Sequence, residues 1–117
     1  MNYHDAKAQC ESDGTFLAIP TTETENDFFA WLIPNENFWI GINDIEKEGS
    51  FVADNGREVS WTNWGPGEPN GGTNENAVEI LNDYSGNLWN DIPASRSLKF
   101  ICFINIEGKL VSFFRIF

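Results

Sequence analysis

Residues 65–76 read GPGEPNGGTNEN and contain no large apolar side chain. A polar stretch of this length, rich in Gly and Pro, is uncommon inside a compact domain and is usually functional or disordered. Trp61 and Trp64 precede it, and the apolar run at 77–81 that follows it is typical of a buried strand. We therefore interpret 65–76 as a long loop that a sheet carries.

Oxygen-bearing side chains collect in this loop and just beyond it, at Glu68, Asn70, Glu75, Asn90 and Asp91. Carboxylates mixed with side-chain amides are the ligands that Ca²⁺ prefers. Neither Cys nor His lies near them in the sequence, which disfavours zinc and copper. A bound cation would also order a loop that has no other evident source of order. The alternative interpretation is an acidic, solvated surface loop.

The composition sets limits on fold and partners. The chain has 117 residues, which is the size of one domain. Its 41% hydrophobic and 15% aromatic residues argue against a disordered chain. Its 7 basic and 18 acidic residues give a formal net charge of −11, which disfavours nucleic acid and anionic membranes as partners and suits a cation binder. We find no apolar run long enough to span a membrane and no signal-peptide pattern at the start.

Two helices and several short strands are predicted. The first helix covers residues 2–12, and the second begins at the T-x-x-E capping box of Thr22 and carries Phe28, Phe29 and Leu32 inward. Strands are expected at 15–20, 38–42, 77–81 and 98–106, with 86–91 as a turn. The pattern predicts an α+β domain, with two helices flanking antiparallel sheets and a long loop.

The two cysteines, Cys10 and Cys102, lie 92 positions apart and are not paired in a metal-binding motif. A disulfide between them would join the two ends of the chain and would stabilise it by roughly 4–5 kcal/mol in the chain-entropy model. Such a bond would imply an oxidising compartment. Two buried free thiols are the alternative.

Five short motifs occur in the order found in C-type lectin domains, and the chain resembles that family over residues 3–104. The motifs are Cys10, FWIGI at 38–42, EPN at 68–70, WND at 89–91 and Cys102. Three longer stretches resemble the collectin branch of the family: WIGINDIEKEGSF at 39–51, WTNWGPGEPN at 61–70 and LWNDIP at 88–93.

The resemblance implies one principal Ca²⁺ ion, held by the EPN and WND motifs together with one acidic residue between them. Its ligands would be Glu68, Asn70, Glu75, Asn90 and Asp91, with Pro69 in a cis peptide. The same five residues would bind a sugar, whose two vicinal hydroxyls would coordinate the ion. The resemblance also implies secretion to the extracellular space.

The order of residues around Pro69 implies a sugar preference. In the family, Glu before the proline and Asn after it, as in Glu68 and Asn70, go with mannose-type sugars: mannose, glucose, N-acetylglucosamine and fucose. The reversed polarity, Gln-Pro-Asp, goes with galactose. The resemblance therefore predicts mannose-type glycans as partners.

A second, weaker calcium site of the family is only partly matched. Asp44 and Glu48 correspond to two of its ligands, and Glu75 would be shared. Two further ligand positions are Gly71 and Asn76, which removes up to two carboxylates. The alternative is that the first two are ordinary turn residues.

Two other departures concern the family's second disulfide and the ends of the chain. The cysteines of that disulfide correspond to Ala77 and Ala94. Residues 1–106 are expected to form the carbohydrate-recognition domain, and 107–117 a short turn and an extra strand of the same domain. That strand would replace the family's first strand, as in a circular permutation, natural or engineered. A strand-swapped dimer and a disordered vector-derived tail are the alternatives.

Catalysis is not expected. His4 is the only histidine and is predicted to lie at the surface, so the chain lacks the residues that a Ser-His or Cys-His mechanism needs. The tryptophans at 39, 61, 64 and 89 are predicted to pack in the core. The rival functions on the same fold are binding of a protein or of ice, and an engineered scaffold with a vestigial sugar site.

Overall fold

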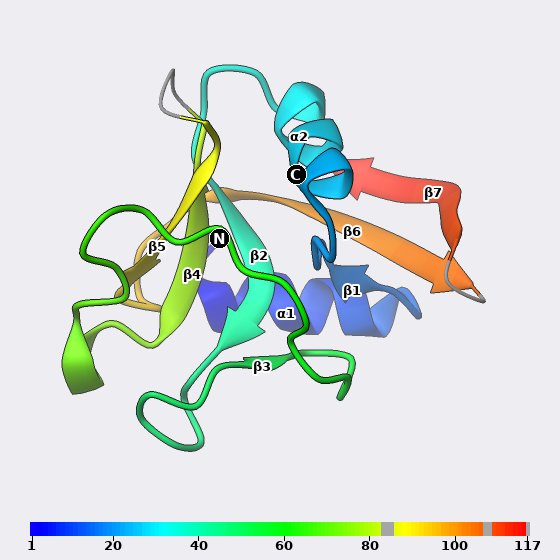
Figure 1. Cartoon of the computed structure of the whole chain (residues 1–117). Coiled ribbons are helices and arrows are strands. Elements are labelled where there is room, and N and C mark those ends of the chain that lie inside the picture. The colour runs from blue at the N-terminus through cyan, green and yellow to red at the C-terminus, as the bar shows by residue number, and fades with distance from the viewer. Residues whose placement is uncertain (83–85, 107–108, 117) are drawn as a thin grey trace.

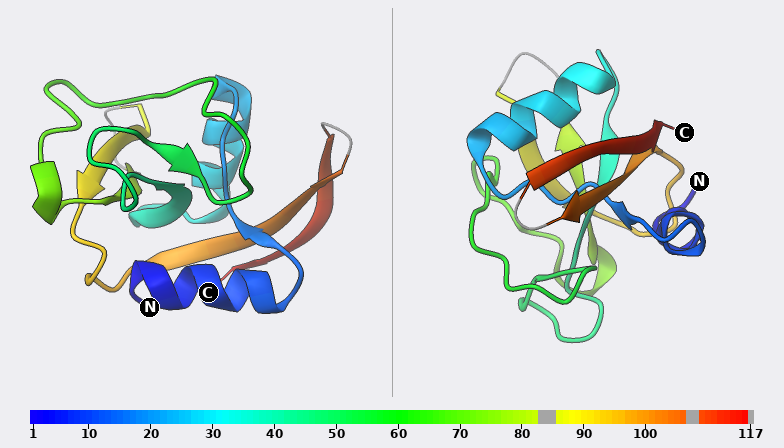
Figure 2. Two further views of the ribbon diagram at one scale, coloured as in Figure 1. Left: turned by 90° about the horizontal axis from the view of Figure 1, so that it is seen from below. Right: turned by 90° about the vertical axis from the view of Figure 1, so that its right-hand side faces the viewer.

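The computed structural model describes residues 1–82, 86–106 and 109–116. Helices α1 (Tyr3–Ser12) and α2 (Glu23–Leu32) lie on opposite sides of the strands (Figures 1 and 2). The strands are β1 (Phe16–Leu17), β2 (Phe38–Asn43), β3 (Val52–Ala53), β4 (Ala77–Leu81), β5 (Leu88–Ile92), β6 (Lys99–Ile106) and β7 (Lys109–Ile116). A short 3₁₀ helix, η1 (Gly72–Asn74), lies in the long loop. The predicted α+β class is confirmed.

Strand pairing departs from the prediction in one respect. The order is β1-β6-β2-β4-β5, with β3 on β2 and β7 on β6. All of these pairs are antiparallel except β2 with β6, where Phe38 and Trp39 lie opposite Lys99 and Phe100 in parallel register. The sheet is therefore mixed, because a connection that includes β4 and β5 separates these two strands and lets them run in the same direction.

Both predicted helices form, and each begins at a capping residue. Asn2 is the N-cap of α1, and its side chain accepts a hydrogen bond from the Asp5 amide at 2.8 Å. The Thr22 hydroxyl accepts one from the Glu25 amide at 3.1 Å. The Glu25 carboxylate bonds to Thr21 instead of completing the reciprocal box with the capping residue.

One of the three residues predicted to point inward from α2 does not. Phe29 is buried and Leu32 packs against the core, but Phe28 is 38% exposed. Its inward place is taken by Asn26, which is fully buried because its amide oxygen accepts a hydrogen bond from the Trp89 indole at 2.8 Å. Asn26 can therefore occupy this buried position in place of Phe28, because it has a hydrogen-bond partner there.

The core forms two clusters that meet at β2. One lies under α2 and contains Trp89, with Trp61 and Trp64 packed against it. The other lies under α1 and contains Trp39. Trp39 and Trp89 are fully buried, which confirms that these tryptophans pack in the core, and His4 is exposed as predicted.

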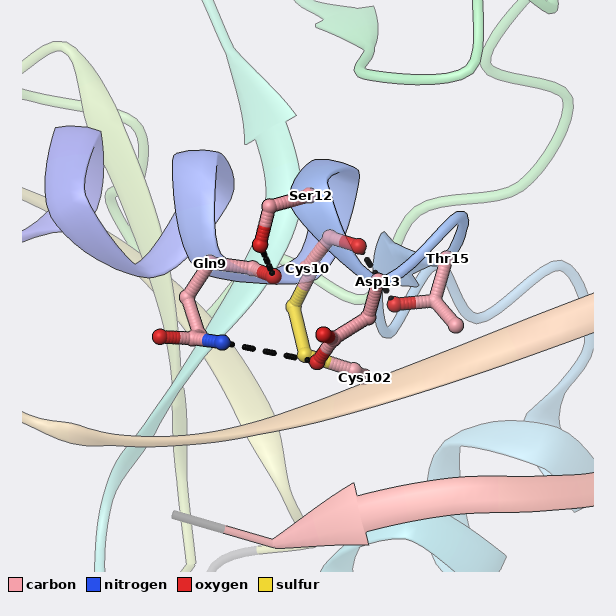
Figure 3. The surroundings of a disulfide bond; sticks show 6 residues. All are labelled: Gln9, Cys10, Ser12, Asp13, Thr15 and Cys102. Atoms are coloured by element: carbon pink, nitrogen blue, oxygen red, sulfur yellow. Dashed lines mark hydrogen bonds between the residues drawn. A yellow bond between two sulfur atoms is a disulfide. The ribbon is translucent and has the colours of Figure 1, made fainter.

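The disulfide between Cys10 and Cys102 is present and joins α1 to β6, with the two Cα atoms 5.2 Å apart (Figure 3). The chain turns after α1 ends at Ser12, and the Cys10 carbonyl accepts hydrogen bonds from the backbone amide of Thr15 at 2.9 Å and from its hydroxyl at 2.7 Å. Both cysteines are fully buried.

The prediction of a turn at residues 86–91 was wrong for most of its length. The turn is confined to Gly86 and Asn87, which have φ angles of 104° and 56°. Strand β5 starts at Leu88 and pairs with β4, so the WND motif lies on a strand. The alternating polar and apolar residues of β5 directly follow this turn, and the prediction wrongly included them in it.

Strand β7 forms in the predicted tail and pairs with β6. The predicted turn at 107–108 lies outside the described residues. In the part of the chain that is described, no helix is both long and apolar enough for a membrane span.

Candidate metal centre

The long loop is fastened to β5 at its entrance. The Trp89 amide donates to the Asn63 carbonyl at 2.8 Å, and the Gly65 amide donates to the Trp89 carbonyl at 2.9 Å. The indoles of Trp61 and Trp64 pack edge-on against Trp89. Beyond this point the chain passes through the cis peptide between Glu68 and Pro69, which confirms the predicted isomer.

Asp91 holds the loop against the sheet. Its side chain is 2% exposed, and its two carboxylate oxygens accept hydrogen bonds from the backbone amides of Asn70 and Gly71, both at 3.0 Å. Hydrogen bonds to a carboxylate are stronger than those between neutral groups. The WND aspartate therefore brings the EPN loop to the end of β5.

Glu68 lies beside Asp91, and none of the described groups that shift its pKa is positively charged. Its Oε1 atom is shielded from water and has no hydrogen-bond partner. Loss of hydration, followed by the hydrogen bond and the charge of Asp91 and the charge of Glu75, raises the pKa of Glu68 to about 7. A buried carboxylate oxygen without a donor is costly unless a cation or a proton neutralises it. The donor set therefore fits a hard divalent cation.

Glu75 lies on the other side of the loop. Its side chain covers Gly71 so closely that a Cβ atom at that position would lie 2.0 Å from the Glu75 Cβ. The missing side chain at position 71 is thus what allows Glu75 to fold over the loop.

Asn90 is oriented differently from the other predicted ligands. Its side-chain amide nitrogen donates to the Glu79 carboxylate at 2.9 Å across the β4–β5 pair. Its Oδ1 atom has no hydrogen bond among the described residues and is the atom suited to an ion. Glu79 is 5% exposed, and burial raises its pKa. Sequence reasoning missed Glu79, although an acidic residue inside a predicted buried strand was a usable signal.

The partly matched second site also contains unpartnered oxygens. Asp44 is 2% exposed; its Oδ2 accepts from the Gly49 amide, while its Oδ1 has no partner. Asn76 donates its amide to the Thr73 carbonyl, and its Oδ1 is also buried and unpartnered.

The carboxylate of Glu48 lies beside Asp44 and adds a third oxygen-bearing side chain to this second site. The amide of Asp44 donates to the Asn76 carbonyl at 3.1 Å, so the two residues are neighbours. Desolvation, followed by the charge and a hydrogen bond of Asp44, raises the pKa of Glu48. The side-chain oxygen of Asn76 therefore offers a neutral ligand that the sequence analysis had not assigned.

The structure thus brings Glu68, Asn70, Glu75 and Asp91 together, with Asn90 adjacent on β5. Among the residues described, no cluster of three or more Asp, Glu, His or Cys side chains has metal-binding geometry. The predicted set depends on amide oxygens as well as carboxylates, and its carboxylates repel one another when no ion lies between them.

The lectin C-type domain profile matches residues 1–104, and the chain belongs to this family of binding domains, which are not enzymes. Collectin-10 of Xenopus tropicalis is 42% identical over 106 residues, which cover 86% of this chain and 38% of that protein. Human C-type lectin domain family 3 member A is 38% identical over 106 residues, covering 86% of this chain and 53% of that protein. The chain thus spans about half or less of these two curated relatives.

Solved structures agree on the fold. The cow CD23 C-type carbohydrate-recognition domain, determined in the presence of a GlcNAc2Man3 oligosaccharide, superposes with a TM-score of 0.78 at 30% identity. The match covers 87% of this chain and 78% of that one. Antifreeze proteins superpose equally well, but at 23–24% identity they show only that the fold is shared.

Proposed function

We propose that this domain binds carbohydrate in a calcium-dependent manner. The observation that carries the proposal is the unpartnered Oε1 of Glu68 beside the buried Asp91 carboxylate, because such a pair needs a cation. Calcium would be held by the five residues predicted from the sequence: Glu68, Asn70, Glu75, Asn90 and Asp91. The bound ion would coordinate two hydroxyl groups of the sugar directly.

The side chains of the chain itself set the sugar preference. A coordinated hydroxyl accepts a hydrogen bond from an asparagine amide and donates one to a carboxylate. Glu68 and Asn70 present acceptor and donor on opposite sides of Pro69, an arrangement that we assign to mannose-type sugars. The cow CD23 domain, solved with a mannose-containing oligosaccharide, supports this choice. A site that contacts two hydroxyls of one sugar is expected to bind it at roughly millimolar strength, about −4 kcal/mol.

The test is retention on immobilised mannose and on immobilised galactose, in millimolar calcium, followed by EDTA. Retention on mannose alone with release by EDTA is expected. The double variant E68Q/N70D, which reverses the polarity around the proline, is expected to shift retention toward galactose. If the double variant keeps the mannose preference, Glu68 and Asn70 do not determine the sugar preference.

We propose further that a second, weaker calcium ion binds at Asp44, Glu48 and Glu75, with Asn76 as an added ligand. The unpartnered oxygens of Asp44 and Asn76 support this site. Calorimetric titration with calcium is expected to give two binding steps, and D44N is expected to remove the weaker one. A single step in the parent domain would contradict the second ion.

The remaining assignments complete the proposal. We assign the domain to the extracellular space, where its disulfide persists. We also assign β7 to the same domain as residues 1–106.

The rival function is binding of a protein or of ice. A calcium-dependent rise in melting temperature without retention on any sugar would favour that rival.

A further inference from the structure

A large and exposed apolar side chain on α2 is not part of the calcium site. Trp31 of α2 is 74% exposed, and Phe28 stacks against it with ring centroids 6.4 Å apart and planes inclined by 24°. Trp31 also lines a surface hollow of about 340 Å³, together with other residues of α2, residues of the segment that follows it, and Asn82 and Asn87.

Among the described residues that line this hollow, those other than Ala30, Trp31 and Pro34 are polar, and Asp27 is the only charged one. Its lining includes Trp31 and Pro34 on the apolar side and Asp27, Asn35, Asn82 and Asn87 on the polar side. None of the described lining residues is basic. The hollow therefore combines one aromatic ring with several side-chain amides, whose oxygens can accept hydrogen bonds from a ligand.

The polar side of the hollow is held in place by buried contacts. Asn87 donates its side-chain amide to Asp27 at 3.1 Å. The carbonyl of Asn87 accepts from the fully buried Asn26 at 3.0 Å, and Asn26 is in turn bonded to the Trp89 indole. This chain of contacts fixes Asn87 relative to α2 before any ligand arrives, which lowers the entropic cost of binding.

Asn82, on the same polar side, is also held in place by hydrogen bonds. Its side-chain amide donates to the carbonyl of Ala30 at 2.9 Å and to that of Ile33, which lies just past the end of α2. Its backbone amide donates to the Asn37 side chain at 3.1 Å. These contacts use carbonyls that a helix end leaves without partners. Trp31 is thus exposed on a rigid support and not on a mobile segment.

We propose that this hollow is a second, calcium-independent carbohydrate site that takes one pyranose ring of a neutral glycan. A pyranose has an apolar face of C–H groups, which suits the electron-rich face of an indole, and a rim of hydroxyls, which suits amides and a carboxylate. An anionic ligand would lack a cation here. A stable protein interface needs about 1,000 Å² of complementary surface, whereas the large apolar side chains that are described at this patch are Phe28, Trp31 and Pro34.

This site is separate from the calcium site. Asn87 lies just before β5 and Asp91 near its end, so they are about 13 Å apart along an extended strand. A variant in one site is therefore not expected to disturb the other. The inference stands independently of the calcium-dependent function.

The experiment titrates the whole chain with maltoheptaose and with the β1–4-linked N-acetylglucosamine tetramer, in excess EDTA, using calorimetry and tryptophan fluorescence. Four proteins are compared: the parent, W31A, E68Q and V52A, the last an exposed apolar control on β3. The parent, E68Q and V52A are expected to bind one of these glycans with equal strength, and W31A at least about tenfold more weakly. W31F, which keeps an aromatic face, is expected to recover part of the binding.

Folding of W31A is checked through its thermal unfolding in EDTA, which is expected to resemble that of the parent. Binding weaker than about 10 mM in EDTA overturns the proposal. Equal binding by W31A overturns it as well, and loss of binding in E68Q would place the glycan at the calcium site instead. Self-association of the parent that W31A abolishes, without glycan binding, would assign the patch to a second copy of the chain.

Discussion

Replacing Asp91 by asparagine separates the structural role of this residue from its proposed role as a ligand. Each carboxylate oxygen of Asp91 accepts one loop amide at 3.0 Å, and the side chain is 2% exposed. In D91N an NH₂ group takes the place of one acceptor and faces a backbone N–H. The loss of one hydrogen bond to a charged group costs about 1.5–3 kcal/mol. For a chain of 117 residues this lowers the melting temperature by roughly 6–12 °C.

The assay is thermal unfolding in EDTA at about pH 6. This pH lies below the pKa of about 7 of Glu68, so the calcium-free Glu68 is mostly neutral and D91N relieves little repulsion between the two carboxyl groups. The matched control is E58Q, because Glu58 is an exposed acid away from the loop. E58Q is expected to melt like the parent.

Calcium separates the two roles further. Added calcium stabilises a folded domain in proportion to RT ln(1 + [Ca²⁺]/Kd), so the parent is expected to gain stability and D91N little or none. If D91N melts like the parent in EDTA, the two amide contacts do not hold the loop, and the reasoning fails. If D91N gains as much from calcium as the parent, Asp91 is not a ligand.

Three more outcomes are expected. The raised pKa of Glu68 favours its protonated form in the folded state. Its contribution to stability in EDTA should therefore be fully present below its ordinary pKa of 4.5 and be lost as the pH rises through about 7, whereas calcium affinity should fall as the pH falls. Melting curves from about pH 4 to 8, with and without calcium, test both signs. The variant C10A/C102A should lose about 4–5 kcal/mol in urea unfolding, and a loss below about 1 kcal/mol would contradict the chain-entropy account. G71A should weaken calcium binding by displacing Glu75, and unchanged affinity in a calcium titration would show that Glu75 does not need that space.

Local sequence signals predicted most of the fold. The capping residue Thr22 gave the start of α2, and the apolar run of β2 gave the central strand, because each signal depends on neighbours in sequence. The parallel pairing of β2 with β6 and the place of Phe28 were not predicted. Both depend on tertiary contacts, since Asn26 is buried only because Trp89 lies opposite it.

The same distinction applies to the candidate site. The EPN and WND motifs identified Glu68 and Asp91, and the structure places them side by side. The bond between Asn90 and Glu79 and the unpartnered oxygen of Asn76 were missed, because they depend on the β4–β5 register and on how the loop returns to β4. A sequence motif identifies the residues within it but gives no information about their partners on a neighbouring strand.

The disulfide between α1 and β6 also determines how the domain carries mechanical load. Tension applied to the chain outside Cys10 and Cys102 passes directly through the sulfur atoms. Only the segments beyond the two cysteines can then be stretched, and the 92-residue span between them, which includes the long loop and the hollow beside Trp31, experiences no pull along its backbone. Both proposed glycan sites can therefore remain folded under a force that unravels β7 from β6.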